Sequence, residues 1–355
     1  MKIRIFSVLL ALCLVLPVLC ACRGGGGEEV HVFYYTYSDT YISSVRTVLG
    51  QKLSEAGLSY QDYDGNGNQT TQTEQIRTAI TQGARALLVN IVNTGSDDAA
   101  SEIVGLARDA GIPLIFFNRE VSDTVIGSYE NCAFVGTRAE EAGFLQGEMI
   151  GEYLLANYAA TDRNGDGKIS YILFKGEEGN NEAIFRTRYS VEGANEILTD
   201  AGKPELVFYD RANTNGYLVD RNGQWSAAAA NEYMTTVLTS FNTANNNMVE
   251  LVICNNDSMA EGAISALNTA GFNTGAGSPT IPVFGVDATE AAKTLIRDKK
   301  MVGTVQQDAA GMADALAHLA SNAVADGRAL MDGTDRFTVD KTVRKIRIAY
   351  AKYLG

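Results

Sequence analysis

Residues 30–57 of the chain, VHVFYYTYSDTYISSVRTVLGQKLSEAG, combine the two patterns from which the fold can be predicted. Val30 to Tyr37 is a short apolar run that predicts a β-strand. The apolar residues that follow recur at three- and four-residue spacing, as one buried helix face requires: Ile42, Val45, Leu49 and Leu53. Gly57 indicates the end of this helix, because glycine readily adopts the left-handed conformation of a C-terminal cap. The stretch therefore predicts one strand followed by one helix.

The same unit recurs in the first half of the chain. Helical spacing at Ile76, Ala79 and Ile80 precedes a predicted strand at 86–92. Similar spacing at Ile103, Leu106 and Ala110 precedes another at 112–117. Runs this apolar are typical of parallel strands that helices cover on both faces.

A second series begins after a break near Thr161. Its predicted strands cover residues 170–175, 206–209, 249–254 and 282–286. Its predicted helices cover residues 191–201, 226–240 and 260–270. Two such series predict an α/β fold with two doubly wound, Rossmann-like lobes, and a length of 355 residues agrees with two domains.

The first residues have the pattern of a bacterial export signal. Lys2 and Arg4 precede an apolar run from Phe6 to Leu19, and the segment Leu19-Cys20-Ala21-Cys22 resembles a lipobox, whose last cysteine is acylated. We therefore expect a lipoprotein signal peptide at 1–21, lipidation of Cys22, and a flexible glycine-containing tether at 22–28. An ordinary signal and a retained apolar anchor are the alternatives.

Composition excludes several classes of function. The formal net charge is −13, and about −15 once the basic residues of the signal are removed, so a nucleic acid partner is not expected. His31 and His318 are the only histidines, and neither follows a predicted strand, which argues against histidine-based catalysis and histidine metal sites. The sequence also lacks a P-loop and a GxSxG motif.

Two cysteines remain after the signal, Cys132 and Cys254. They are far apart in sequence and fall in different predicted lobes, so no disulfide framework or CxxC metal site is available. We expect buried free thiols, with a single bridge as the alternative.

Polar residues stand directly after the predicted strands, where the ligand of a doubly wound sheet binds. They share short, planar side chains: Asp39, Asn118, Asn256, Asp257 and Asp287. Carboxylates and amides suit the hydroxyl edge of a polyol, and Tyr41 and Trp225 offer aromatic surfaces for its C–H faces. Taken singly, each Asp or Asn is equally explained as a helix cap or turn residue. Their joint placement favours a binding site.

Six segments, in order, resemble the sugar-contacting segments of the bacterial periplasmic galactose/glucose-binding proteins. They are YSDTY at 37–41, FFNRE at 116–120, KGEEGNNEAIFR at 175–186, ICNNDSMA at 253–260, FGVDA at 284–288 and GTVQQDA at 303–309. The resemblance covers the chain from about Val30 to the C-terminus. It implies a type I periplasmic binding protein, with two lobes joined by a three-stranded hinge, that binds D-glucose or D-galactose with high affinity.

The resemblance also implies roles for individual residues. The pyranose would lie between Tyr41 and Trp225. Hydrogen bonds would come from Asp39, Asn118, Arg186, Asn256 and Asp287. Asn180 and Glu182 stand where the family usually has His and Asp, and Gln307 stands in place of Asn. Each change keeps a polar group, although Glu182 and Gln307 are one methylene longer and alter the pocket.

The lobes of such a fold are discontinuous in sequence. We expect hinge crossings near Thr137, Gln307 and Arg344, with an N-terminal lobe of 29–137 plus 308–344 and a C-terminal lobe of 138–307 plus 345–355. The resemblance implies an ABC permease in the inner membrane as partner, and it leaves a chemoreceptor open as another. We expect a monomer, anchored by lipid on the periplasmic or outer side of a bacterial membrane.

Residues 162–169 contain the D-x-N-x-D-G-x-I pattern of a calcium loop. Side chains at Asp162, Asn164 and Asp166 converge in such a loop, and Gly167 allows the sharp turn. Lys168 would contribute its carbonyl and Ser170 occupies the ninth position, whereas Leu173 stands where the loop needs a bidentate carboxylate. The family resemblance places that carboxylate at Glu250. We therefore expect a structural Ca²⁺, with a plain polar loop as the alternative.

A second loop, 62–67, carries a similar start at Asp62, Asp64, Asn66 and Gly67. Its eighth and twelfth positions are Gln69 and Thr73, which lack the apolar anchor and the carboxylate. We interpret this loop as a fortuitous match.

Other functions remain open on the sequence alone. The ligand could be another pentose or hexose, or a nucleoside. Asp39 and Asp287 could form the carboxylate pair of a glycosidase, although sequence gives no distance between them. A structural surface lipoprotein is the third alternative. A sugar-responsive repressor is excluded, because the signal occupies the place of its DNA-binding head. We favour the hypothesis that the protein is a transport receptor and not an enzyme.

Overall fold

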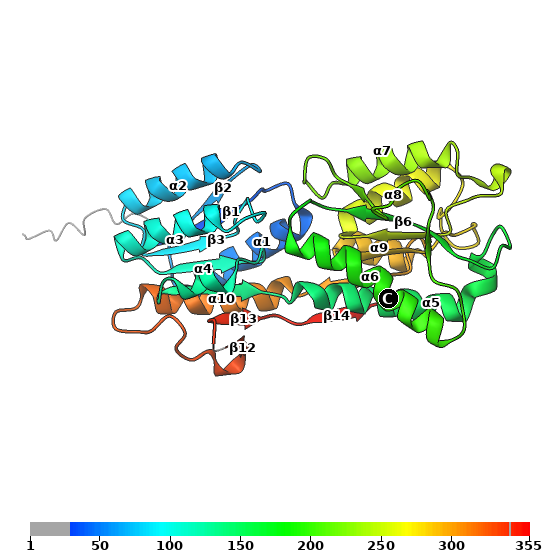
Figure 1. The fold of residues 1–355 in the computed structure, drawn as a ribbon. Helices are drawn as coiled ribbons and strands as arrows, with labels where there is room; N and C mark the ends of the chain where they lie inside the picture. Colours follow the sequence, from blue (N-terminus) through cyan, green and yellow to red (C-terminus); the bar gives the residue numbers. More distant parts are fainter. Residues whose placement is uncertain (1–28, 341) are drawn as a thin grey trace, which may run out of the picture.

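The structure is a computed structural model that describes residues 29–340 and 342–355. The chain forms two α/β lobes that lie side by side, each built on its own sheet (Figure 1). The predicted signal peptide, Cys22 and the rest of the tether lie outside the described residues. None of the helices in the described part is long and apolar enough to cross a membrane.

The first lobe has a sheet of seven strands. Across the sheet their order is β12 (Thr338–Asp340), β13 (Lys345–Arg347), β5 (Cys132–Gly136), β4 (Leu114–Phe117), β3 (Ala86–Val89), β1 (Val30–Tyr34) and β2 (Tyr60–Asp64). β12 pairs antiparallel with β13, and the other pairings are parallel. The switch of order between β1 and its neighbours opens a crevice at the carboxyl ends of the strands.

Helices cover both faces of this sheet. α1 (Thr40–Glu55) and α10 (Ala309–Val324) pack on one face, where Val32 and Val45 are buried. α2 (Gln69–Thr81), α3 (Asp98–Ala110) and α4 (Asp123–Gly127) pack on the other, around Phe33. Neighbouring residues of β1 thus enter opposite cores, which explains why the strand is apolar throughout.

The second lobe repeats the arrangement. Its strand order is β14 (Tyr350–Tyr353), β11 (Gly303–Gln307), β10 (Val283–Asp287), β9 (Leu251–Cys254), β6 (Ser170–Lys175) and β7 (Val207–Phe208), with β8 (Leu218–Val219) also paired to β6. α5 (Ala139–Thr161) and α6 (Asn181–Asp200) cover one face. α7 (Ala227–Leu238), α8 (Asp257–Thr269) and α9 (Glu290–Arg297) cover the other. Short 3₁₀ helices lie at Thr243–Asn245 and Thr334–Arg336.

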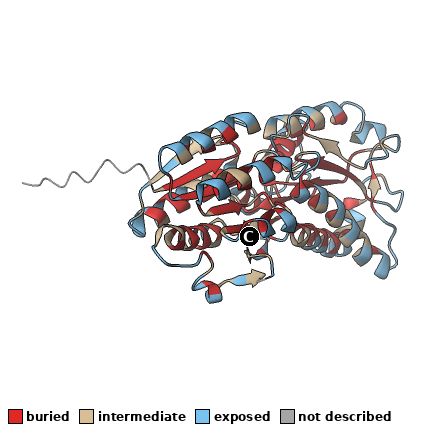
Figure 2. Ribbon diagram, turned by 60° about the vertical axis from the view of Figure 1, so that its left-hand side comes forward, coloured by how far each residue is buried: buried red, intermediate tan, exposed pale blue. Residues whose placement is uncertain are grey.

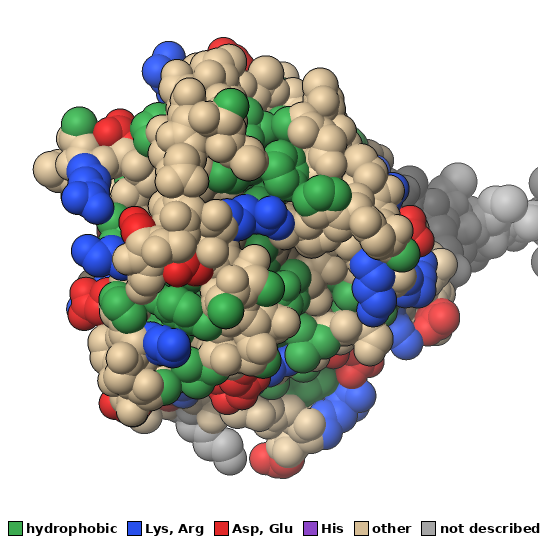
Figure 3. Space-filling model, turned by 90° about the vertical axis from the view of Figure 1, so that its right-hand side faces the viewer, with side chains coloured by type: hydrophobic (Ala, Val, Ile, Leu, Met, Phe, Trp, Pro, Cys, Tyr) green, Lys and Arg blue, Asp and Glu red, His purple; other side chains and the backbone are tan. Residues whose placement is uncertain are grey.

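Buried residues concentrate in the two sheets and in the helix faces turned toward them (Figure 2). At the outer end of the second lobe, acidic and basic side chains are interspersed rather than gathered by sign (Figure 3). Cys132 and Cys254 are free and buried, one in each lobe, as expected from the sequence. The two helix-covered, mostly parallel sheets confirm the predicted fold class.

Three chain segments join the lobes. The first lies between β5 and α5, at Thr137, and the second between β11 and α10, next to Gln307. The third crossing was predicted near Arg344, which is wrong by a few residues. Residues 345–347 form β13, and Ile346 pairs with Val135 in the first sheet. The crossing therefore follows Arg347, and the N-terminal lobe extends past 344.

Candidate ligand-binding cleft

The carboxyl ends of the strands in the two lobes face a common cleft, which contains about 370 Å³ of space free of protein atoms. All ten residues proposed from the sequence as sugar contacts line it: Asp39, Tyr41, Asn118, Asn180, Glu182, Arg186, Trp225, Asn256, Asp287 and Gln307. Tyr35, Ile42 and Arg119 line it too, and they are absent from the predicted set.

Asp39 is both a helix cap and a cleft residue. Its Oδ1 accepts a hydrogen bond from the Ile42 amide at 2.8 Å, which caps α1. Its Oδ2 accepts from the hydroxyl of Tyr35 at 2.6 Å. Asp39 is therefore both a helix cap and a binding-site residue, the two interpretations that the sequence left open. Capping fixes its carboxylate at the edge of the cleft.

Tyr41 is the second residue of α1, and only 6% of it is exposed. Its hydroxyl donates to Sδ of Met312 at 3.8 Å, so α1 and α10 together hold the ring in place.

Asn118 follows β4 in a left-handed conformation, with φ of 60°. Its Oδ1 accepts from Nδ2 of the buried Asn90 at 3.1 Å. Asn90 Nδ2 also donates to the carbonyl of Phe117. Asn118 is therefore oriented by a neighbour on the adjacent strand end, which leaves its amide NH₂ for the cleft.

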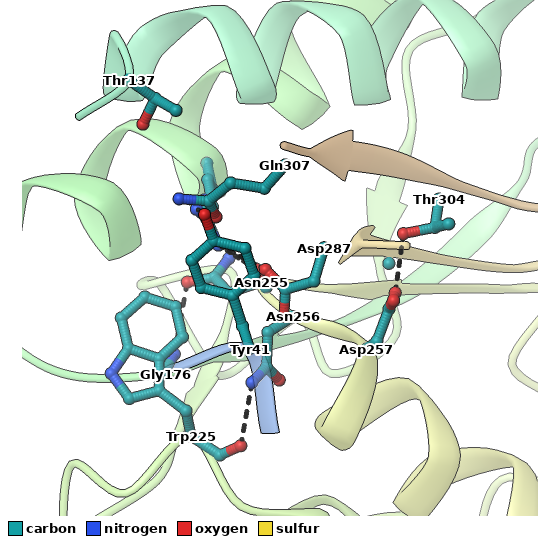
Figure 4. A network of polar contacts seen from close by, with 12 residues as sticks. Tyr41, Thr137, Gly176, Trp225, Asn255, Asn256, Asp257, Asp287, Thr304 and Gln307 are labelled. Carbon is teal, nitrogen blue, oxygen red and sulfur yellow. Dashed lines mark hydrogen bonds and ion pairs between the residues drawn. The ribbon is translucent and has the colours of Figure 1, made fainter. Parts of the chain in front are cut away.

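Trp225 presents its indole to the cleft beside Gly176 (Figure 4). A Cβ placed on Gly176 would lie 2.1 Å from two atoms of the indole, so only glycine allows the ring to sit there. Asn256 caps α8 through Oδ1 and donates from Nδ2 to the carbonyl of Trp225 at 3.2 Å. Asn256 thus fixes the backbone of Trp225, whose φ is 54°.

Arg186 is buried at the hinge side of the cleft. Its Nη1 donates to the carbonyl of Asn255 at 2.9 Å and lies 3.9 Å from Oδ1 of Asp287. Its Nη2 donates to Oε1 of Gln307 at 3.1 Å and to the hydroxyl of Tyr350 at 2.9 Å. These contacts fix the guanidinium at the strands that cross between the lobes.

Two carboxyl groups of the cleft are deeply buried. Burial raises the pKa of Asp287 well above its ordinary value, while the Arg186 guanidinium opposes the shift. Burial also raises the pKa of Glu182, against the attraction of Arg186 and Arg119. Neither oxygen of Glu182 accepts a hydrogen bond from the protein. An unpaired buried carboxylate of this kind is suited to the hydroxyl donors of a ligand.

Buried donors complement these acceptors. Arg186 Nε and Gln307 Nε2 make no hydrogen bond to the protein. Asn180 is already engaged, because its Oδ1 caps α6 and its Nδ2 donates to Thr94 Oγ1 of the other lobe at 3.2 Å. The cleft therefore offers both donors and acceptors to a neutral polar ligand.

Of the residues that sequence reasoning missed, Arg119 directly follows Asn118 in the FFNRE segment. Tyr35 lies within the stretch predicted as the first strand, just beyond the end of β1. Nothing in the sequence indicated the role of the Tyr35 hydroxyl, because that role depends on its hydrogen bond to Asp39.

The candidate calcium loop connects α5 and β6, and Glu250 meets it from the segment before β9. Glu250 is fully buried, and its carboxylate accepts from the amides of Arg163 at 2.7 Å and Ser170 at 2.9 Å. Asp162 likewise accepts from the amides of Gly165 and Gly167. The oxygen donors suit a hard cation in kind.

No group of three or more His, Cys, Asp or Glu side chains in residues 29–340 and 342–355 has the geometry to hold a metal ion. In this conformation the loop carboxylates serve backbone amides. In the second loop, Oδ1 of Asp64 accepts from the amides of Tyr37 and Asn66.

Comparison with known proteins agrees with the two-lobed cleft, which is the architecture of a solute receptor. Residues 30–329 match the family model described as periplasmic binding protein domain. The D-galactose/methyl-galactoside binding periplasmic protein of Haemophilus influenzae is 33% identical over 318 residues, which are 89% of this chain and 87% of that protein.

Solved structures show the same fold. A glucose-bound ABC transporter solute-binding protein from Clostridium phytofermentans has a TM-score of 0.70 at 20% identity, covering 92% of this chain and 93% of that one. A myo-inositol-bound protein from Bacillus halodurans has a TM-score of 0.67 at 23% identity, covering 93% and 96%. The relatives are solute-binding proteins rather than enzymes. This chain belongs to the periplasmic binding protein family.

Proposed function

We propose that the protein binds a neutral monosaccharide, D-glucose or D-galactose, in the cleft and delivers it to an ABC transporter. The observation that carries this proposal is the buried, unpaired carboxylate of Glu182 in a cleft that Trp225 and Tyr41 also line. Aromatic rings suit the C–H faces of a pyranose, and carboxylate and amide groups suit its hydroxyls. The similarity to a galactose-binding relative supports the same ligand class.

Binding would couple to lobe closure. The cleft residues come from both lobes, so a ligand that contacts both stabilises the closed state by its difference in affinity for the closed and open states. Scattering should therefore show a smaller radius of gyration at saturating sugar. A profile that sugar leaves unchanged would argue against closure.

Calorimetry on Asp287→Ala tests the ligand site. A hydrogen bond to a charged group contributes about 1.5–3 kcal/mol, so this change should weaken binding of both sugars about ten- to hundred-fold. Asp200→Ala, at the exposed end of α6, is the matched control and should bind normally. Equal affinity of Asp287→Ala and the unaltered protein would place the sugar elsewhere. D-xylose and myo-inositol in the same panel test the wider class of ligand.

The remaining proposals concern location and partners. We propose that Cys22 is acylated and anchors a monomer to the membrane near an ABC permease; a chemoreceptor is a further candidate partner. The lipobox and the family membership support this. Labelling cells with a palmitate analogue should mark the unaltered chain and not Cys22→Ala.

We also propose a structural Ca²⁺ at the 162–170 loop, supported by its oxygen donors and by the meeting of Glu250 with the loop backbone. Asp162, Asn164, Asp166, Lys168 through its carbonyl, Ser170 and Glu250 are the candidate ligand set. Adding EDTA should lower the melting temperature, because loss of an ion bound to the native state destabilises it.

A further inference from the structure

We propose that Arg119 and Glu177 form a latch between the lobes, and that the latch holds Trp225 against the ligand only when the cleft is closed. The proposal rests on the proposed function, since it concerns the regulation of the same cleft. Glu177 does not line the cleft, so it acts as a positioning residue.

The ion pair joins the two lobes. Arg119 follows β4 of the first lobe, whereas Glu177 follows β6 of the second. Arg119 Nη2 donates to both carboxylate oxygens of Glu177, at 2.8 and 3.0 Å. The side chain of Arg119 is 5% exposed and that of Glu177 21% exposed. A charge-assisted bond shielded to this degree is stronger than an exposed surface pair.

Each end of the pair continues into the ligand site. On the first lobe, the Arg119 guanidinium lies over the ring of Tyr35, 4.4 Å from its centroid, and Tyr35 donates to Asp39. On the second lobe, the indole Nε1 of Trp225 donates to Oε2 of Glu177 at 3.3 Å. The latch therefore connects a cleft carboxylate of one lobe to the cleft aromatic of the other.

This arrangement assigns different roles in the two states. When the lobes part, Arg119 and Glu177 separate, and Glu177 retains only its contact with the indole in its own lobe. On closure, the Arg119 guanidinium binds the Glu177 carboxylate and fixes its position. The fixed carboxylate in turn holds the plane of the Trp225 indole. Because the ion pair exists only after closure, it stabilises the closed complex and slows its reopening.

Glu177→Gln is the variant of choice, because it keeps the shape and an acceptor oxygen for the indole while removing the charge. Glu178→Gln is the matched control. Glu178 is the next residue of the same loop, and its partners Lys175 and Tyr217 both lie in the second lobe.

Stopped-flow binding of glucose and galactose separates the two rates. Glu177→Gln should raise the dissociation rate about ten-fold and change the association rate little. A charge-assisted bond is roughly twice as strong as a neutral one, and this energy difference corresponds to about a ten-fold change in an equilibrium constant. Trp225 is the only tryptophan, so the fluorescence change on binding reports its environment directly and should shrink in Glu177→Gln. Glu178→Gln should match the unaltered protein. A slower association with unchanged dissociation would overturn the latch.

A second measurement needs no ligand. Thr40 and Ser258 meet across the cleft, with their hydroxyl oxygens 2.9 Å apart, so Thr40→Cys with Ser258→Cys forms a disulfide only in the closed state. Its formation constant in a glutathione buffer measures the closed population. Adding Glu177→Gln should lower that constant about ten-fold, and adding Glu178→Gln should not. Equal constants would refute the latch, whereas failure of every sugar to bind the unaltered protein would refute the proposed function alone.

Discussion

Gly176→Ala tests whether the indole of Trp225 is a ligand surface. The added Cβ would lie 2.1, 2.1 and 2.5 Å from three indole carbons, whereas carbon atoms in contact lie about 3.5–4.0 Å apart. The ring must therefore retreat by more than about 1 Å. Gly176 is not among the glycines with positive φ, so its backbone accepts alanine without strain. The substitution thus moves one aromatic surface and keeps its chemistry.

The expected loss follows from the contact that the indole makes. An aromatic contact contributes about 0.5–1.5 kcal/mol beyond area burial, so binding should weaken about three- to ten-fold. Both sugars should lose affinity equally, because a ring face reads C–H groups and not the configuration of one hydroxyl. Calorimetry gives the affinities, and fluorescence of the sole tryptophan reports whether the ring has moved.

Gly105→Ala is the matched control, since a Cβ at Gly105 in α3 meets nothing within 4 Å. Its sugar affinity and fluorescence should equal those of the unaltered protein. A shifted fluorescence in Gly176→Ala with unchanged affinity for both sugars would refute the stacking role of Trp225.

Three further predictions concern charge and metal. Asp39→Asn should change the ratio of glucose to galactose affinity if its carboxylate contacts O4, as the family resemblance implies, and calorimetry with both sugars decides this. Burial raises the pKa of Asp257 to about 7, so the native state keeps a proton that the unfolded chain releases near its ordinary value of 3.8. Stability should therefore fall by a few kcal/mol as pH rises from about 4 to 7, and Asp257→Asn should flatten the dependence of urea midpoints on pH. Finally, Glu250→Gln should abolish most of the EDTA effect on melting temperature, while Asp64→Ala in the 62–67 loop should retain it; equal EDTA effects in both variants would contradict the assigned loop.

Much of the fold could be predicted because many strands and helices show the spacing of apolar residues that is typical of their type. α5 was not predicted from the sequence, and its packing explains why. Gly143, Gly147 and Gly151 recur every four residues on the face that meets α6, where a Cβ on Gly147 would lie 2.8 Å from the carbonyl of Tyr189. Close helix packing therefore needed glycines where an apolar stripe is expected, which removed the usual signal.

The site was predictable where a residue type and a strand end coincide, as at Asp287 and Asn118. It was not predictable where the role depends on a distant partner. The role of Arg119 depends on its ion pair with Glu177, which lies 58 residues away and in the other lobe. The third hinge crossing was misplaced for a related reason. β13 is short and contains Lys345, a charged residue that is buried because its Nζ reaches Glu120 at 2.7 Å.

Two opposing contributions then account for a cleft that closes on its ligand. The ion pair between Arg119 and Glu177 favours closure whether or not a ligand is bound. In the conformation described here, the Glu182 carboxylate, Arg186 Nε and Gln307 Nε2 are buried without protein partners. Each buried, unpaired polar group costs about 1–3 kcal/mol, so these groups together outweigh one partly exposed ion pair. A ligand whose hydroxyls both donate and accept removes that cost, and an apolar ligand of the same size does not. The balance therefore makes closure depend on hydroxyl groups, which is the selectivity that a sugar receptor needs.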